Sequence, residues 1–294
     1  MKEDIDTEEF IDIHFHTGPE IIPRKFNAEE FVEEESGKLR GAVLKNHMYS
    51  TQAMINSLEA KEIELFGAVA LNRFTGGMNP NTVRASAEIS EKPLTVWFPT
   101  LDAENFLEEK DYEIPPEWTE GAYSRRADDV EPVKVSKNGE LTNETVEVIE
   151  AIAETGSILA TGHISWQEAE KVVEKALELG VEKVILTHPI YGPINMPVEV
   201  QKELAENEEV FVEELYAMNR IDGIPVEEIA EQIREVGPEN VVLGSDMGQV
   251  GNPSSSEALK IFAEALIDEG FTESEIREMT VENPAEVLDL EALR

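Results

Sequence analysis

Short apolar runs alternate with amphipathic segments along the whole sequence, and this alternation restricts the fold more than any other feature. Eight runs rich in Val, Ile, Leu and Phe are typical of strands. The predicted strands are residues 10–16, 39–45, 65–72, 94–98, 157–161, 183–187, 210–215 and 241–246. Eight strand and helix units in 294 residues predict an α/β fold, a single (β/α)₈ TIM barrel over residues 1–294. An open doubly wound sheet is the alternative, but it normally uses fewer strands.

Helix signals fill the spaces between these strands. Predicted helices span residues 28–35, 50–58, 142–154, 165–179, 197–206, 225–236 and 254–268. Asn79 followed by Pro80 opens a further helix, as an N-cap before a first-turn proline. Ser165 with Glu168 and Thr272 with Glu275 have the spacing of capping boxes. The second capping box begins C-terminal helices that follow the last strand.

Residues 103–140 break the alternation and form a long insertion between the fourth and fifth strands. We expect residues 133–135 to begin a hairpin that turns at Asn138 and Gly139. Loops of this length in a compact domain are often functional, as a lid or a binding loop, or are mobile. A functional loop and a decorative one are both compatible with the sequence.

The charge balance is strongly acidic, with 63 Asp and Glu against 24 Lys and Arg and a formal net charge of -39. Such a surface repels phosphate backbones and anionic lipids, so we expect no nucleic-acid or membrane partner. The acidic residues are interleaved with apolar ones, which indicates a solvated surface and not a disordered tail. Our hypothesis is a halophile with an acidic proteome, because high salt screens the self-repulsion, and an ordinary acidic protein is the alternative.

The sequence contains no cysteine, which excludes disulfides, thiolate catalysis and a Cys-ligated zinc. The first residues lack the basic and apolar parts of a signal peptide, and no apolar run is long enough to span a membrane. We therefore expect a cytoplasmic protein, with a homo-oligomer compatible with the sequence.

All five histidines fall at or just past the C-terminal end of a predicted strand. They are His14, His16, His47, His163 and His188. His14 and His16 are one residue apart, so both side chains face the same side of their strand and can reach one metal ion. Strand ends of a barrel converge on one pocket, and Asp246 ends the last strand. The pattern favours a metal site over isolated structural histidines.

These residues resemble the metal-binding pattern of the amidohydrolase superfamily. The resemblance implies His14, His16, His163, His188 and Asp246 as metal ligands on a (β/α)₈ barrel. Residues 282–288 are similar to the segment with which many members end. Residues 43–47, 71–77, 160–163 and 186–189 resemble a poorly characterised, amidohydrolase-like branch. The resemblance covers nearly the whole chain and leaves the substrate open.

The sequence departs from this pattern at the fourth strand. Members with two metals usually carry a carboxylated lysine or a glutamate there, whereas this strand ends in residues 97–100 without either. Only Asp102 could supply a ligand by folding back. Lys45, two residues before His47 on the same strand face, could bridge two ions if carboxylated. The alternative is an unmodified Lys45 that binds substrate or pairs with Asp246, so one or two ions are compatible with the sequence.

Imidazole and carboxylate ligands suit Zn²⁺, with Mn²⁺, Fe²⁺, Co²⁺ and Ni²⁺ as alternatives. The cation would lower the pKa of a bound water toward about 7 and polarise the substrate. Asp246 would carry the proton to the leaving group, and His188 or His163 could contact the oxyanion. The resemblance thus implies a hydrolase that acts on an amide, lactone or other ester. A metal-dependent decarboxylase and a non-catalytic metal-binding barrel are the alternatives.

Further polar residues at strand ends or in the insertion are candidates for binding a small-molecule substrate. They are Asn46, His47, Asn72, Arg73, Glu213, Arg125 and Arg126. The adjacent arginines are unusual in so acidic a chain and could hold a carboxylate or phosphate. Surface pairing with Asp128, Asp129 and Glu131 is the competing interpretation.

Overall fold

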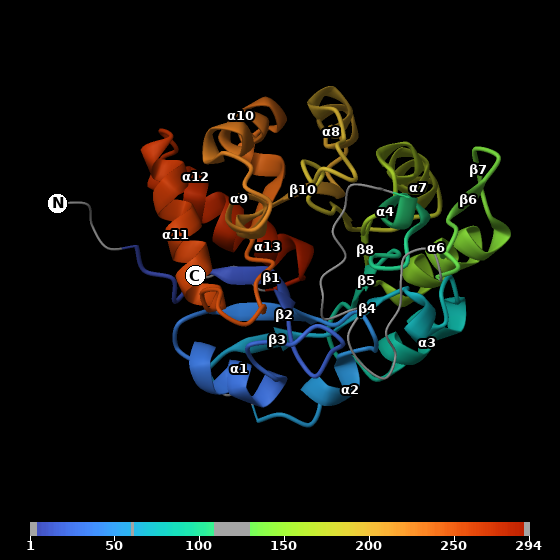
Figure 1. The fold of residues 1–294 in the computed structure, drawn as a ribbon, viewed down its shortest axis with the longest axis horizontal. Helices are drawn as coiled ribbons and strands as arrows, with labels where there is room; N and C mark the ends of the chain where they lie inside the picture. The colour runs from blue at the N-terminus through green and yellow to red at the C-terminus, as the bar shows by residue number, and fades with distance from the viewer. Residues whose placement is uncertain (1–4, 60–61, 109–129, 291–294) are drawn as a thin grey trace.

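A computed structural model describes residues 5–59, 62–108 and 130–290 of the chain. Parallel strands form a central barrel surrounded by helices (Figure 1). The barrel strands are β1 (Ile11–His16), β2 (Gly41–Lys45), β3 (Glu64–Phe66), β4 (Ala68–Ala70), β5 (Thr95–Trp97), β8 (Ile158–Ala160), β9 (Val184–Leu186), β10 (Val210–Leu215) and β11 (Val241–Gly244). Because β3 and β4 share one position, the eight strand positions of a (β/α)₈ barrel are present, and this fold prediction is confirmed.

The helices pack around the strands (Figure 1). They are α1 (Ala28–Glu35), α2 (Gln52–Ile55), α3 (Pro80–Glu88), α4 (Glu104–Glu108), α6 (Asn143–Thr155), α7 (Trp166–Glu178), α8 (Val198–Leu204), α9 (Tyr216–Arg220), α10 (Val226–Val236), α11 (Ser255–Asp268), α12 (Glu273–Arg277) and α13 (Asn283–Val287). Short turns η1 (Arg73–Thr75), η3 (Pro238–Asn240) and η4 (Glu278–Glu282) link some of them. Both predicted capping boxes are present, and the Asn79 side chain accepts a bond from the Asn81 amide.

The third barrel strand is interrupted at Gly67, where residues 65–72 had predicted one continuous strand. A Cβ atom at Gly67 would lie 2.0 Å from Oε1 of Gln52, so only glycine allows the two segments to approach. The helix predicted over residues 50–58 is also shorter, because α2 ends at Asn56, whose side chain donates to Ile89 O at 2.7 Å.

The described part of the insertion contains α4 and a hairpin of β6 (Ser136–Lys137) and β7 (Glu140–Leu141). The hairpin turns at Asn138 and Gly139 as predicted, with positive φ angles of 55° and 82° that suit a two-residue turn. The first strand of the hairpin was predicted over residues 133–135, but β6 begins only at Ser136. Val135, the residue before it, is buried in the core. Arg125 and Arg126 lie outside the described residues.

The barrel is closed by contacts between β1 and the segment that follows β11. The Asp246 amide donates to His14 O at 2.8 Å, and the His16 amide donates to Met247 O at 2.9 Å. Residues from the two ends of the sequence therefore meet at one edge, and this edge carries His14, His16 and Asp246.

The interior of the barrel has an apolar lower part, formed by inward side chains that include Ile11, Phe66 and Phe211. Ala285 and Val287 of α13 pack against this cluster from below the strands. A second, larger cluster fills the space between the strands and the surrounding helices. Because both layers are packed, free space is left at the C-terminal ends of the strands.

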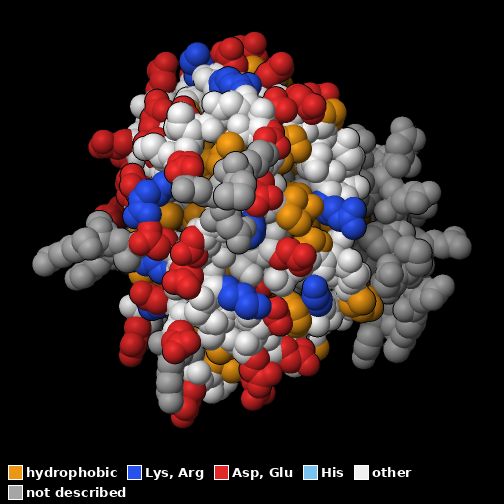
Figure 2. Space-filling model, turned by 90° about the vertical axis from the view of Figure 1, so that its left-hand side faces the viewer, with side chains coloured by type: hydrophobic (Ala, Val, Ile, Leu, Met, Phe, Trp, Pro, Cys, Tyr) orange, Lys and Arg blue, Asp and Glu red, His pale blue; other side chains and the backbone are white. Residues whose placement is uncertain are grey.

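The exterior carries many more acidic than basic side chains, and on the face shown in Figure 2 the red acidic groups are spread over the surface. No helix among the described residues is long and apolar enough to cross a membrane.

Candidate active site

A β-bulge in β1 sets the direction of the two histidines. Asp12 is aligned with Ala42 and Phe15 with Leu44, so two residues of β1 oppose one residue of β2. A bulge of this kind re-aims the side chains that follow it. His14 and His16 consequently line the cavity inside the barrel, while Phe15 packs outward on Phe31 at a ring separation of 4.5 Å.

Asp12 stabilises this bulge and connects it to β11. Its Oδ1 accepts from the amides of His14 at 3.1 Å and Ser245 at 2.9 Å. Its Oδ2 accepts from the hydroxyl of Ser245 at 2.5 Å and from the hydroxyl of Ser255. Burial raises the pKa of Asp12 to about 6, and these bonds oppose the rise. Asp12 thus fixes the backbone immediately before His14 and Asp246, a role that our sequence analysis missed.

All five histidines line one cavity of about 310 Å³ at the C-terminal ends of the strands. Their rings form a row in the order His47, His16, His14, His188 and His163. The distances between the centroids of successive rings in this row are 4.6, 5.2, 6.0 and 5.1 Å. The structure therefore brings together the residues that the sequence predicted to converge.

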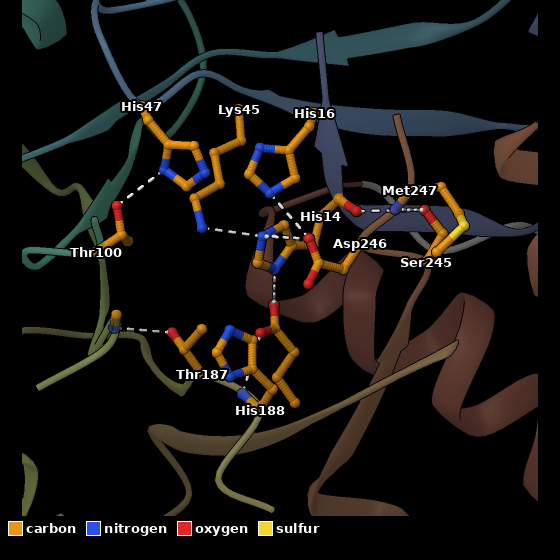
Figure 3. A network of polar contacts seen from close by, with 12 residues as sticks. His14, His16, Lys45, His47, Thr100, Thr187, His188, Ser245, Asp246 and Met247 are labelled. Atoms are coloured by element: carbon orange, nitrogen blue, oxygen red, sulfur yellow. Dashed lines mark hydrogen bonds and ion pairs between the residues drawn. The ribbon is translucent and has the colours of Figure 1, made fainter. Parts of the chain in front are cut away.

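Two carboxylates, those of Asp246 and Glu213, contact this row of rings, and Figure 3 shows Asp246 beside His14 and His16. Oδ1 of Asp246 lies 2.9 Å from Nε2 of His16 and 3.4 Å from Nε2 of His14. Oε1 of Glu213 lies 3.1 Å from Nδ1 of His14, and its Oε2 accepts from the His188 amide at 3.2 Å. If the neutral His14 carries its proton on Nδ1 and donates it to Glu213, its Nε2 is the acceptor for the Lys45 ammonium at 2.9 Å and is the nitrogen that a cation would take.

Burial keeps the histidines neutral. It lowers the pKa of His14, His16 and His163 well below the ordinary value and that of His188 to about 3, with neighbouring cations adding to the effect. Nδ1 of His163 and Nδ1 of His188 are buried and have no hydrogen-bond partner among the described residues. Neutral imidazoles with unshared lone pairs are good ligands for a divalent cation.

The donor set fits a cation. His14, His16 and Asp246 each offer one atom, and these atoms lie within 4.8 Å of one another. His16, Glu20 and His47 form a second group with the same property. Glu20 was not among the predicted site residues, because the loop after β1 carries no periodic signal. A divalent metal is therefore compatible with the residues present.

Lys45 lies at the centre of the site. Its Nζ is 2.9 Å from Nε2 of His14 (Figure 3). The same Nζ is 4.6 Å from the ring centre of Trp97. Burial lowers the pKa of Lys45 to about 8, against the opposing effect of Asp246 and Glu213. The Trp97 indole fills the inward end of β5, where the resemblance would place a bridging ligand. Asp102 accepts from the Arg73 amide at 2.8 Å and is not among the residues that line the cavity.

The predicted substrate-binding residues are placed differently from one another. His47 lines the cavity, with Nδ1 2.8 Å from Oγ1 of Thr100. Asn46 donates to Thr17 O, Asn72 donates to His47 O, and neither is in the cavity wall formed by the described residues. Arg73 is exposed and also outside that wall. The side chains of Asn46 and Asn72 thus support the loops behind the site, and Glu213 contacts His14 Nδ1.

Comparison with known proteins supports the fold. A family model described as a family of unknown function (DUF6282) matches residues 9–213, more than half of the chain. No curated protein sequence matches the chain significantly. Solved structures do match, at low sequence identity, so that the likeness concerns the fold.

An amidohydrolase from Pseudomonas aeruginosa matches with a TM-score of 0.61 and 14% identity over 95% of this chain and 94% of that one. A putative 2-pyrone-4,6-dicarboxylic acid hydrolase from Pseudomonas putida matches with a TM-score of 0.58 and 12% identity over 97% and 99%. A probable dipeptidase from Pseudomonas aeruginosa matches with a TM-score of 0.56 and 11% identity over 95% and 94%. The expected likeness to amidohydrolases is confirmed at the level of the barrel.

Proposed function

We propose that this chain, which belongs to the family of unknown function DUF6282, is a metal-dependent hydrolase that acts on an amide, lactone or other ester bond of a small molecule. The observation that carries the proposal is the triad of His14, His16 and Asp246, whose donor atoms lie within 4.8 Å of one another. The triad stands in a cavity at the C-terminal ends of barrel strands, where such folds hold their catalytic residues.

His14, His16 and Asp246 would hold the cation, and Zn²⁺ suits this set of nitrogen and oxygen donors, with Mn²⁺, Fe²⁺, Co²⁺ and Ni²⁺ as alternatives. Such a cation supplies a water of lowered pKa and polarises the bond to be cleaved. His163 and His188, with their unshared Nδ1 atoms, would take a second cation or contact the oxyanion of the substrate.

Asp246 is the proposed proton carrier. Burial raises the pKa of Asp246 to about 7, and the charge of Lys45 opposes the rise. A carboxylate beside the metal ligands can accept a proton from water and release it to a leaving group. Its Oδ1 lies 2.9 Å from Nε2 of His16 and 3.4 Å from Nε2 of His14, so the proton would be held where the water must be activated.

Lys45 decides the number of ions in this proposal. An unmodified ammonium 2.9 Å from Nε2 of His14 repels a second cation. A carboxylated Lys45 would instead present an anion that bridges two cations. We therefore expect one equivalent of metal for the unmodified residue and two equivalents when protein is loaded in bicarbonate and Lys45 is carboxylated.

The test begins with metal analysis of protein purified without chelator, followed by a screen of lactones, esters and amides. We expect at least one equivalent of transition metal. His16→Ala should lose both metal and activity. Asp246→Asn should keep metal and lose activity by about 10²-fold to 10⁴-fold, the usual contribution of general acid–base catalysis.

Asp289→Asn is the matched control for Asp246→Asn. Asp289 has a φ of 51° and Asp246 a φ of 49°, so both substitutions place Asn in the same left-handed conformation. Asp289 lies outside the cavity and its variant should keep full activity. Less than one equivalent of metal in the parent protein, or full activity in Asp246→Asn, would contradict the proposed function.

A further inference from the structure

We propose that Arg24 binds a carboxylate of the substrate, and that the substrate is a small molecule with this anion beside the reacting bond and an apolar part toward the cavity mouth. The inference rests on the proposed function for the identity of the site. It adds a substrate class and a binding residue that the metal ligands do not specify.

Arg24 is a buried cation in the wall of the cavity. Its side chain is 2% exposed, and it lines the cavity together with His16 and Lys45. Nε pairs with Glu20, and Nη2 lies 3.2 Å from Nδ1 of His16. A guanidinium has five N–H donors in a rigid plane, a geometry that suits a carboxylate.

The loop that carries Arg24 is fixed in place before any ligand binds. The backbone of Arg24 forms an antiparallel bridge with Gln249, and the Lys25 amide donates to Gly248 O at 2.7 Å. Glu20 is fully buried, and its Oε1 accepts from the His47 amide at 3.0 Å. Because both partners of the ion pair are anchored, the guanidinium is preorganised for binding.

His16 connects Arg24 to the candidate metal site. Its Nδ1 lies 3.2 Å from Nη2 of Arg24, and its Nε2 lies 2.9 Å from Oδ1 of Asp246. A carboxylate held by the Arg24 guanidinium would therefore lie beside the His16 ring and the bond to be cleaved.

A single carboxylate fits this surrounding better than a phosphate. Arg24 and Lys45 are the only lysine or arginine side chains in the cavity wall formed by the described residues. Asp222 and Asp246 also line the wall, and Glu20 already neutralises Arg24. Each negative charge of a ligand is opposed by these carboxyl groups, so a monoanion loses less of the guanidinium contact than a dianion does.

Apolar side chains form the other part of the cavity wall. Ile22, Met218, Ile221 and Val250 belong to this part. Ile221 is 49% exposed and Val250 is 68% exposed, so both present apolar surface at the cavity. A ligand with an apolar portion would cover them, since removal of apolar surface from water favours binding.

The test uses full-length Zn²⁺-loaded protein and two hydroxamates that both bind zinc. Acetohydroxamate has no further anion, whereas succinic monohydroxamate adds one carboxylate. We expect the carboxylate to improve Kd by at least tenfold in calorimetric titrations. Arg24→Gln should remove this gain while its zinc content and its affinity for acetohydroxamate stay within twofold of the parent protein.

Two further variants separate binding from structure. Arg24→Lys keeps the charge without the planar donors and should retain part of the gain. Lys25→Gln removes a neighbouring positive charge whose Nζ binds Asn252 O, and it should keep the whole gain. A gain that survives in Arg24→Gln, no gain in the parent protein, or tighter binding of phosphonoacetohydroxamate than of the succinic probe would each overturn the inference.

The proposed function can fail separately from this inference. If the protein takes up no zinc and acetohydroxamate does not bind, the metal site is wrong. If the protein takes up zinc and binds acetohydroxamate, and only the affinity gain from the carboxylate is missing, the role of Arg24 is wrong. For the apolar part, each methylene added to an alkyl hydroxamate should tighten binding by up to about fourfold, and Val250→Asn should reduce this increment. An increment that is absent in the parent protein would overturn the apolar assignment.

Discussion

Glu213 and Glu214 are neighbours on β10, and both are fully buried, yet they lie in two different regions of the molecule. Glu213 faces the interior of the barrel and contacts His14 Nδ1 and the His188 amide. Glu214 is on the opposite face of the strand, and neither of its carboxylate oxygens has a hydrogen-bond partner in the part of the chain that the structure describes. Burial alone therefore does not identify a functional carboxylate; the groups that it contacts do.

The same distinction applies to Asp12, the third buried carboxyl group of this part of the barrel. Asp12 accepts from four donors on β1, directly after β11 and at the start of α11. The partners of Asp12 make it a structural connection between strands. The contacts of Glu213 orient His14, a proposed metal ligand. Glu214 contributes a desolvation cost that no hydrogen bond among the described residues offsets. Three predictions follow from this ranking of buried acids.

The largest effect is expected for Asp12→Ala. The substitution removes the acceptor of two buried amides and of the Ser255 hydroxyl, and leaves the Ser245 hydroxyl only its longer contact to His14 O at 3.3 Å, at about 1 kcal/mol or more for each lost bond. We expect the free energy of unfolding, measured in urea, to fall by about 4 kcal/mol. Asp12→Asn keeps one acceptor oxygen and should lose about half as much. A loss below about 1 kcal/mol for Asp12→Ala would remove Asp12 from the group of structural carboxylates.

The next effect is a gain of stability in Glu214→Gln that depends on pH. Burial raises the pKa of Glu214 from 4.5 to about 8. The folded protein keeps a proton that the unfolded chain releases in this range, so Glu214 costs stability increasingly as pH rises from 4.5 to 8. Gln cannot ionise, and its advantage should grow from near zero at pH 5 to a few kcal/mol at pH 8.

Thermal unfolding of the parent protein and of Glu214→Gln across this pH range measures the difference in their free energies of unfolding. The contributions of the other titrating groups cancel in this difference, because both proteins contain them. A difference that does not change with pH would mean that Glu214 has a partner in solution, and the contrast with Glu213 would disappear.

The smallest effect in free energy is expected for Glu213→Gln. A carboxylate accepts from both His14 Nδ1 and the His188 amide, whereas an amide oxygen can replace only one of these contacts well. Loss of such an orienting partner typically weakens metal binding by about 10-fold to 100-fold. Competition with a zinc chelator measures this, and Glu214→Gln is the matched control with unchanged affinity. Equal affinities in the two variants would show that the inward carboxylate has no special role.

The sequence predicted the strands and the meeting of the five histidines well, because both depend on short-range patterns. Period-two alternation marks residues 10–16 as a strand, and parallel topology then brings its end beside those of 183–187 and 241–246. These inferences need no knowledge of which particular side chains touch.

Features that depend on distant partners could not be predicted. The bulge at Asp12 relies on Ser245 and Ser255, which are 233 and 243 residues away. Arg24 and Glu20 belong to a loop without periodicity, positioned by Gln249 and His47. The break at Gly67 depends on the side chain of Gln52. An aspartate in the middle of an apolar strand was the one local signal that could have indicated Asp12.

The closure of the barrel also has a consequence for the order of events during protein synthesis. A chain leaving the ribosome exposes His14 and His16 early, but Asp246 and the serines that bind Asp12 emerge only after most of the chain has been translated. Until then β1 lacks the segment after β11 that pairs with one of its edges, and Asp12 lacks the bonds that it accepts from Ser245 and Ser255. The candidate metal site is therefore among the last parts of the molecule to be completed, and a truncated translation product would not assemble it.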